Sequence, residues 1–273
     1  MTMSHSDNVL ALADGSAWQI TGRDEGASVI LSSLKEILQL RSFNGPCRRL
    51  ILTTGDRRAF VPDTAPDGLE ISLPLLDDAD YSPGAVFAQA MRPVCRDLQS
   101  RGGLFIHGAV AERDGLGVIM AGVSGIGKTT ACSRLPSPWR CRSDDKALVV
   151  RDRKGYYWAH PWPTWSRFRR SGTGGSWEVS RAVALQGLFF LAQAPEDRVE
   201  PIKTGHAACM LVETCQEAAF LSLELGDTGE GLRMQRLKRF DSICELVKSI
   251  PSFMLHVSVT GSFWNEIDAV LDQ

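Results

Sequence analysis

Residues 122–129 have the types and spacing of a phosphate-binding loop. The sequence GVSGIGKT fits GxxxxGK[ST] at every fixed position, an apolar run precedes it, and a helical pattern follows it. Glycines let the backbone turn so that successive amide groups face phosphate oxygens. Lys128 would reach the β- and γ-phosphates, and the Thr129 hydroxyl suits Mg²⁺. We therefore expect a site for ATP with Mg²⁺, contacted by Gly122, Val123, Ser124, Gly125, Ile126, Gly127, Lys128, Thr129 and Thr130.

Two adjacent aspartates, Asp144 and Asp145, come just before the apolar run 147–150. Neighbouring residues of an extended chain face opposite sides, so the two carboxylates should do different jobs. One could hold Mg²⁺ through water, while the other accepts a proton from an incoming hydroxyl. The alternative is an acidic turn or cap without a chemical role.

His107 lies inside the β-like sequence Phe105-Ile106-His107-Gly108. A single histidine in such a run is commonly a hydrogen-bonded core residue. The functional alternative is a group that contacts the γ-phosphate or an aspartate, where its charge would depend on its surroundings. The sequence leaves both interpretations open.

The order His107-Gly108, hairpin, phosphate-binding loop and Asp144-Asp145 resembles the catalytic core of HPr kinase/phosphorylase. That family is related in fold to phosphoenolpyruvate carboxykinase, and the resemblance covers about residues 104–151. It implies a P-loop kinase that transfers the γ-phosphate of ATP to a serine or threonine hydroxyl. It also implies catalytic roles for both aspartates, with Asp144 linked to the metal and His107 supporting the aspartate on the phosphate side.

Residues 157–166 and 174–177, which are rich in tryptophan, resemble the SynChlorMet cassette ScmC proteins. The resemblance implies a setting of peptide modification beside radical SAM enzymes. The expected acceptor is then a peptide or small protein, and the expected partners are a PqqD-like carrier and a radical SAM enzyme. The segment Trp177-Glu178-Val179 is a candidate counterpart of the LEIRG-type segment of HPr kinases, which makes Glu178 a candidate metal residue.

Further candidates lie near the ends of apolar runs. Arg198 follows the apolar run 188–192 and could contact phosphates in a bidentate manner. His160 is either a residue near the nucleotide or a strand-end residue. Trp162, Trp165 and Trp177 lie in loop-like segments that form either a recognition surface or a packed loop.

The elements that must position these residues follow from hydrophobic periodicity. We expect an α/β fold with a small N-terminal α/β region over residues 1–100. A P-loop domain over 101–273, with a core like that of HPr kinase and phosphoenolpyruvate carboxykinase, should follow. Strands are expected over residues 17–21, 47–54, 69–73, 104–111, 118–121, 147–151, 156–160, 188–192 and 253–259. Helices are expected over 27–40, 86–98, 128–134, 206–219, 234–249 and 263–271.

Composition narrows the classes of function. The net charge is −2 and the pI is near 6.2, which argues against a nucleic-acid partner. The seven cysteines contain no CxxC pair, so we expect neither a zinc site nor a disulfide framework, but reduced and mostly buried thiols. The N-terminus does not read as a signal peptide, and no apolar stretch approaches membrane-spanning length. These features predict a cytoplasmic protein without a membrane partner.

Two rival functions remain at this point. One is a small-molecule kinase that uses the same nucleotide site on a metabolite. The other is a non-catalytic ATP-binding scaffold in a peptide-maturation complex. Lys128, Thr129 and both aspartates favour catalysis, because a scaffold does not need them.

Overall fold

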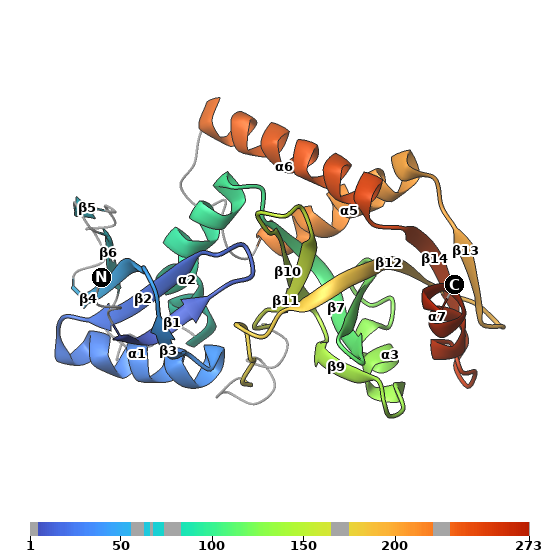
Figure 1. The fold of residues 1–273 in the computed structure, drawn as a ribbon, viewed down its shortest axis with the longest axis horizontal. Helices are drawn as coiled ribbons and strands as arrows, with labels where there is room; N and C mark the ends of the chain where they lie inside the picture. The colour runs from blue at the N-terminus through green and yellow to red at the C-terminus, as the bar shows by residue number, and fades with distance from the viewer. Residues whose placement is uncertain are drawn as a thin grey trace. The chain divides into compact units, whose positions relative to one another are not determined.

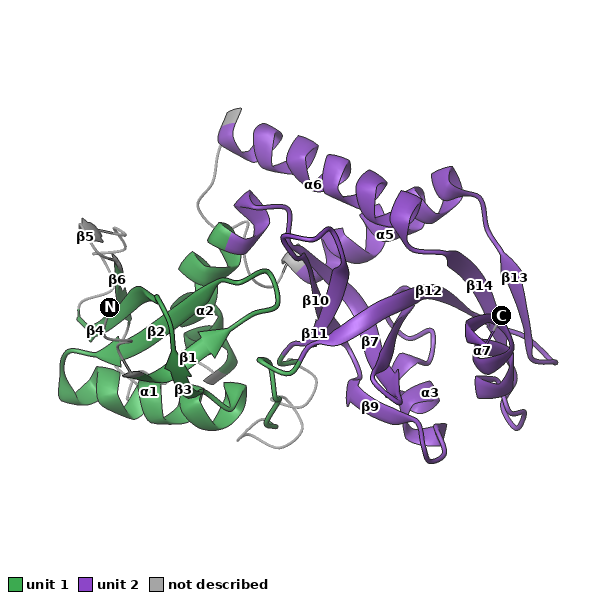
Figure 2. Ribbon diagram, viewed as in Figure 1, with its two compact units in different colours: residues 1–97, 163–181 green, residues 98–162, 182–273 purple. Residues whose placement is uncertain are grey.

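The computed structural model describes residues 5–55, 63–65, 68–73, 83–164, 175–220 and 230–272. These residues form two β-sheets and six helices, so the protein is of the mixed α/β class (Figure 1). The chain divides into two compact units (Figure 2). Unit 1 contains residues 1–97 and 163–181, and unit 2 contains residues 98–162 and 182–273.

Unit 1 is built on a six-stranded sheet in the order β3-β1-β2-β4-β6-β5. The central strands β2, β4 and β6 run parallel, and the remaining pairs are antiparallel. The strands are β1 (His5–Ala11), β2 (Ala17–Gly22), β3 (Arg41–Asn44), β4 (Arg48–Thr54), β5 (Asp63–Ala65) and β6 (Gly68–Leu73). The helices are α1 (Glu25–Leu38) and α2, which spans Pro83–Ser100 and so reaches just into unit 2.

Helix α1 begins where Asp24 caps it. One carboxylate oxygen of Asp24 accepts the amide hydrogen of Ala27 at 2.8 Å, and the other accepts that of Thr54, at the end of β4, at 2.8 Å. The helix then buries Ile30, Leu34 and Ile37, which share one face by their spacing. A single side chain therefore caps α1 and ties its start to the sheet.

Unit 2 contains the P-loop and an eight-stranded sheet in the order β11-β10-β7-β8-β12-β14-β13, with β9 also paired to β7. The strands are β7 (Leu104–Arg113), β8 (Leu116–Ala121), β9 (Arg140–Ser143), β10 (Lys146–Arg151), β11 (Tyr157–Pro161), β12 (Val183–Gln193), β13 (Arg198–Pro201) and β14 (Ser252–Val257). The helices are α3 (Lys128–Arg134), α5 (Thr204–Phe220), α6 (Glu230–Ser249) and α7 (Trp264–Leu271). Strand β12 runs parallel to both β8 and β14.

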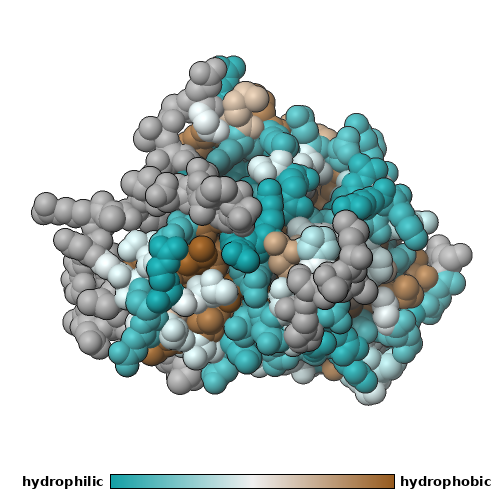
Figure 3. Space-filling model, turned by 60° about the vertical axis from the view of Figure 1, so that its left-hand side comes forward, coloured by the Kyte–Doolittle hydropathy of each residue, from teal (hydrophilic) through white to brown (hydrophobic). Residues whose placement is uncertain are grey.

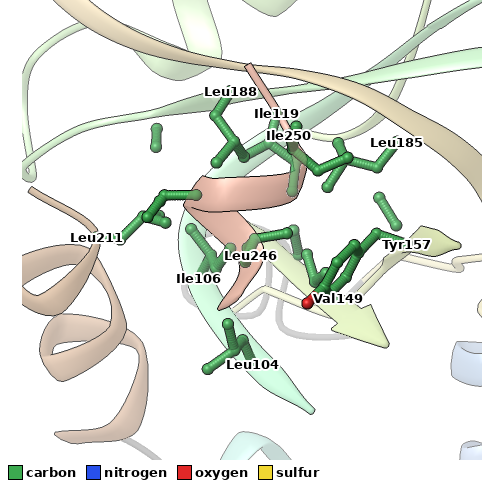
Figure 4. Packing of buried hydrophobic residues seen from close by; sticks show 14 of the residues in the cluster. Leu104, Ile106, Ile119, Val149, Tyr157, Leu185, Leu188, Leu211, Leu246 and Ile250 are labelled. Carbon is green, nitrogen blue, oxygen red and sulfur yellow. The ribbon is translucent and has the colours of Figure 1, made fainter. Parts of the chain in front are cut away.

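Both faces of this sheet are covered. Alternate residues of β8 point to opposite sides, as the period of a strand requires. Ile119 and Ala121 pack with Leu211 of α5 and Leu246 of α6 in one cluster, part of which Figure 4 shows. Val118 and Met120 pack on the other face with residues of α3 and α7. The two layers hold β8 rigidly, and the P-loop begins at the end of this strand.

Most of the expected elements are present, and α3 has the expected bounds. Three differences have physical causes. The strands β1, β3, β5, β9 and β13 were not predicted, because they are short or rich in polar residues. Strand β12 begins five residues earlier than expected, since the register shifts between Leu185 and Gly187 and so absorbs the polar Gln186. Helix α2 begins three residues earlier than expected and continues through Pro93.

The surface, the helices and the cysteines can be compared with what the composition predicted. The face in Figure 3 is mostly hydrophilic, with hydrophobic residues in small separate patches. None of the described helices combines the length and hydrophobicity needed to cross a bilayer. All seven cysteines are free, as expected, but only Cys95, Cys132 and Cys215 are fully buried, so the expectation of mostly buried thiols was wrong.

Candidate functional site

The P-loop joins the C-terminal end of β8, an interior strand of the sheet in unit 2, to helix α3. Gly125 and Gly127 have φ angles of 84° and 111°, which a side chain would strain. No described atom lies within 4 Å of the position that a Cβ would take at either glycine. The loop is therefore open above these two residues, as a cradle for phosphate oxygens must be.

Lys128 is the first residue of α3 and is only 5% exposed. Its ammonium group donates hydrogen bonds to the carbonyl oxygens of Gly122 at 2.7 Å and Val123 at 3.0 Å. Burial lowers the pKa of Lys128, while the negative charges of Asp145, Glu217 and Asp144 act in the opposite direction. The ammonium group is thus held by the loop backbone, within the field of three carboxylates.

Asp144 lies in the turn between β9 and β10 and faces the P-loop. Its Oδ2 accepts a hydrogen bond from the Thr129 hydroxyl at 3.0 Å. Its Oδ1 is buried and has no hydrogen-bond partner within the described residues. A buried carboxylate oxygen without a partner is costly, and a cation beside it would remove that cost.

This arrangement fits Mg²⁺ better than a metal held by the protein alone. The described residues contain no group of three or more His, Cys, Asp or Glu side chains that could hold an ion. Mg²⁺ commonly takes one or two protein ligands and completes its shell with water and substrate phosphates. Thr129 and Asp144 together supply such a partial set.

Asp145 points to a different partner, the imidazole of His107 on β7. The His107 Nε2 lies 2.9 Å from Asp145 Oδ1, and the other ring nitrogen, Nδ1, contacts Glu217 of α5. Burial alone would raise the pKa of Asp145. The hydrogen bond and charge of His107, with the charges of Lys128 and Lys146, outweigh that effect and keep its pKa below the usual value. His107 is thus clamped between two carboxylates from separate elements.

Lys146, the first residue of β10, connects the chain next to Asp145 with helix α5. Its ammonium group is buried and donates to the carbonyl oxygen of Ala218 at 3.2 Å, next to Glu217. The sequence analysis did not identify Glu217 or Lys146. Glu217 lies 110 positions from His107, and no local pattern in the sequence signals that pairing.

The structure thus brings several candidate residues into one group, namely Lys128, Thr129, Asp144, Asp145 and His107, and adds Glu217. The two aspartates contact different partners, so one face of the site could hold a metal-bound phosphate while the other accepts a proton.

Other candidates lie elsewhere. Arg198 is on β13, three strands from β8 in the sheet order, where its guanidinium group contacts Glu200 at 2.8 Å and His256 at 3.3 Å. Its expected contact with phosphate stays a prediction. Glu178 belongs to unit 1 and pairs with Arg41 at 2.6 Å and Arg181 at 3.6 Å. Its expected metal role stays a prediction.

The tryptophan-rich segment is mostly interior where it is described. Trp162 is buried and packs edge-on against Phe105, with ring centroids 5.0 Å apart, and Trp177 is also buried. These two side chains therefore favour a packed loop over a recognition surface. His160 is fully buried within β11, while Trp165 lies outside the described residues.

Comparison with protein families identifies a match. The family model described as SynChlorMet cassette protein ScmC matches residues 83–272, more than two thirds of the chain. The matched range includes the P-loop, both aspartates, His107 and Glu217. The search of curated proteins found no match.

Proposed function

The chain belongs to the SynChlorMet cassette protein ScmC family, and we propose that it is an ATP-dependent kinase resembling HPr kinase. In this proposal it transfers the γ-phosphate to a serine or threonine hydroxyl of a peptide or small protein. The observation that carries the proposal is the division of labour between adjacent carboxylates. Asp144 bonds to the P-loop residue Thr129, whereas Asp145 bonds to His107.

Each residue would have a defined task in the transfer. The P-loop amides and Lys128 bind and orient the phosphates, and Thr129 with Asp144 would hold Mg²⁺. When bound, Mg²⁺ would neutralise charge on the phosphate oxygens. Asp145 accepts the proton of the acceptor hydroxyl as its oxygen bonds to the γ-phosphorus. The bond between that phosphorus and the β–γ bridging oxygen breaks, and ADP leaves.

The surroundings of Asp145 are compatible with its role as a base. A general base must be deprotonated before the reaction, and an aspartate whose pKa lies below 3.8 meets that requirement at neutral pH. His107, held by Glu217, fixes the direction of the Asp145 carboxylate. The family context supports a peptide acceptor, because the resemblance to ScmC proteins implies peptide modification beside a radical SAM enzyme and a PqqD-like carrier.

The test compares wild type with Asp145→Asn, using ATP labelled at the γ-phosphate, Mg²⁺ and precursor peptides encoded beside the gene. Loss of a general base lowers such rates by about 10²–10⁴-fold. We expect a loss of that size for Asp145→Asn, with ATP binding retained. Asp114→Asn, in the β7–β8 turn, is the matched control and should transfer phosphate like wild type.

Equal labelling by wild type and Asp145→Asn would refute the role of Asp145. Labelling of metabolites but of no peptide would favour the small-molecule kinase. ATP binding without any turnover, together with binding to a precursor peptide, would favour the non-catalytic scaffold.

A further inference from the structure

A pocket of about 230 Å³ lies beside the P-loop in unit 2. One wall is formed by residues 191–194 and 257–259, at the ends of the parallel strands β12 and β14. The other wall is formed by Ile126 and Gly127 of the P-loop and by residues of α3. In the sheet order, β12 and β14 lie on one side of β8, and β7 and β10 lie on the other. His107 is on β7, and Asp145 directly precedes β10. The pocket and the two aspartates therefore lie on opposite sides of the P-loop.

The pocket wall is suited to a flat apolar ring. Its side chains are mostly aliphatic, such as Ile126, Leu191 and Val257, and none of the described lining residues is acidic. Small-molecule sites are typically concave and apolar with a few polar groups. Backbone groups, the Gln193 amide and the hydroxyls of Thr130 and Ser258 supply those polar groups here.

Arg134 is the only charged residue among those that line the pocket in the described structure, and its charge is already engaged. Its guanidinium group donates to the carbonyl oxygens of Ser258 at 2.7 Å and Gly261 at 2.5 Å. It also lies over the ring of Phe263, 5.2 Å from the centroid. Arg134 therefore closes the wall and is not free to form a second phosphate site.

The loop that follows β14 is fixed before any ligand arrives. Asp197 accepts the amide hydrogen of Ser258 at 2.6 Å, and the Ser258 hydroxyl accepts that of Gly261 at 2.9 Å. A Cβ at Gly261 would lie 2.0 Å from Asp197 Oδ2, so only glycine fits there. These contacts, with those of Arg134, give the pocket a preformed wall.

We propose that this pocket holds the base and ribose of the nucleoside triphosphate, an inference that rests on the proposed function. Successive residues of the chain connect the two regions. Thr129 contacts Asp144, while Thr130 and Ala131 line the pocket. A nucleotide with its phosphates in the loop thus reaches the pocket at its nucleoside end and the two aspartates at its γ-phosphate.

The test separates the nucleoside from the phosphates by calorimetry in Mg²⁺, with ATP and inorganic tripolyphosphate as ligands. Ala194→Phe and Val257→Phe each add a ring at the pocket wall from a different strand end. We expect at least tenfold weaker binding of ATP by both variants, with tripolyphosphate binding within about twofold of wild type. Val29→Phe, at an exposed position of α1, is the matched control and should bind both ligands like wild type. Unchanged tripolyphosphate binding also shows that the variants are folded.

Two results would overturn the inference while leaving the P-loop function intact. One is equal affinity of wild type for ATP and tripolyphosphate, since the nucleoside would then contribute nothing. The other is undiminished ATP binding by both phenylalanine variants. If wild type bound neither ligand, the proposed function would fail, and the inference would fail with it.

Discussion

Glu217 connects helix α5 to Asp145 through the imidazole of His107. It contacts His107 Nδ1, while Nε2 of the same ring contacts Asp145. A carboxylate on the far nitrogen of a histidine fixes the orientation of the ring. Glu217 is therefore a positioning residue for Asp145, in the same way that a distal carboxylate orients a catalytic histidine in other enzymes.

We predict that Glu217→Gln lowers phosphate transfer by about 10- to 100-fold, less than the loss expected for Asp145 itself. The side chain keeps its size but loses its charge, so the KM for ATP should change little while kcat falls. Steady-state kinetics with labelled ATP checks this. Glu213→Gln, one turn earlier on α5 and exposed, is the control that should behave like wild type. A fall in ATP affinity without a change in kcat would contradict the positioning role.

A second prediction concerns the unpartnered oxygen of Asp144. If Thr129 and Asp144 hold Mg²⁺, Asp144→Asn removes a negative ligand and should raise the Mg²⁺ concentration that half-saturates ATP binding by about tenfold or more. Titration of Mg²⁺ at fixed ATP measures this. Binding of ATP in EDTA should stay the same in the variant and wild type. Identical Mg²⁺ curves would remove Asp144 from the metal site.

The residues of this site differ in how far the sequence could identify them. The P-loop and the aspartate pair have local spacing that predicts chemistry before any fold is known. The sequence left two interpretations of His107 open, because its partners come from the β9–β10 turn and from α5. Glu217 has no local signal at all, since its role arises when α5 packs against β7. Arg198 contacts Glu200 on β13, and its expected contact with phosphate stays a prediction.

At the scale of elements, hydrophobic period predicted the long helices and buried strands well. Helix α3 was predicted over its full length because Gly127 directly precedes it and Pro136 follows shortly after its end. Short polar strands were missed, since β9 and β13 owe their conformation to pairing with β7 and β14 and not to their own sequence. The missed strand β9 matters for the site, because it delivers the chain to Asp144.

The start of α1 gives a prediction at this scale. Asp24 accepts hydrogen bonds from the amide of Ala27 and from the hydroxyl and amide of Thr54, and these bonds lower its pKa from 3.8. We expect Asp24→Ala to lower the urea midpoint of unfolding at pH 7, because both the cap and the tie to β4 are lost. Glu36→Ala, on the exposed side of α1, is the control and should shift the midpoint little.

The effect of Asp24 should also depend on pH in a defined direction. A carboxylate with a lowered folded-state pKa stabilises the protein above its unfolded pKa, and this contribution disappears as pH falls through the folded value. The difference in midpoint between wild type and Asp24→Ala should therefore be full at pH 6–7 and shrink below about pH 3.8. A difference that stayed constant down to pH 3 would mean that the carboxylate charge is not what stabilises α1.

At the scale of the whole molecule, the two compact units do not follow the order of the chain. The sequence suggested one boundary near residue 100, whereas residues 163–181 return to unit 1 from the middle of unit 2. The sequence did not predict this return, because it depends on long-range contacts. The amide of Trp177 donates to the carbonyl oxygen of Ile37 at 2.8 Å, and the hydroxyl of Ser180 accepts the amide hydrogen of Ala11 at 3.3 Å.

Trp177 is the side chain that makes this return a structural part of unit 1. It is 3% exposed, so truncation to alanine removes a large buried ring and should cost about 3–5 kcal/mol of local stability. We predict that Trp177→Ala speeds amide hydrogen exchange in α1 and β1 but leaves β7 and β8 protected. Trp158→Ala is the matched control, because Trp158 lies on β11 of unit 2 and donates to Asp152 at 3.1 Å, so it should loosen unit 2 instead. Faster exchange in β8 than in α1 after Trp177→Ala would show that residues 175–181 support the P-loop unit and not the N-terminal one.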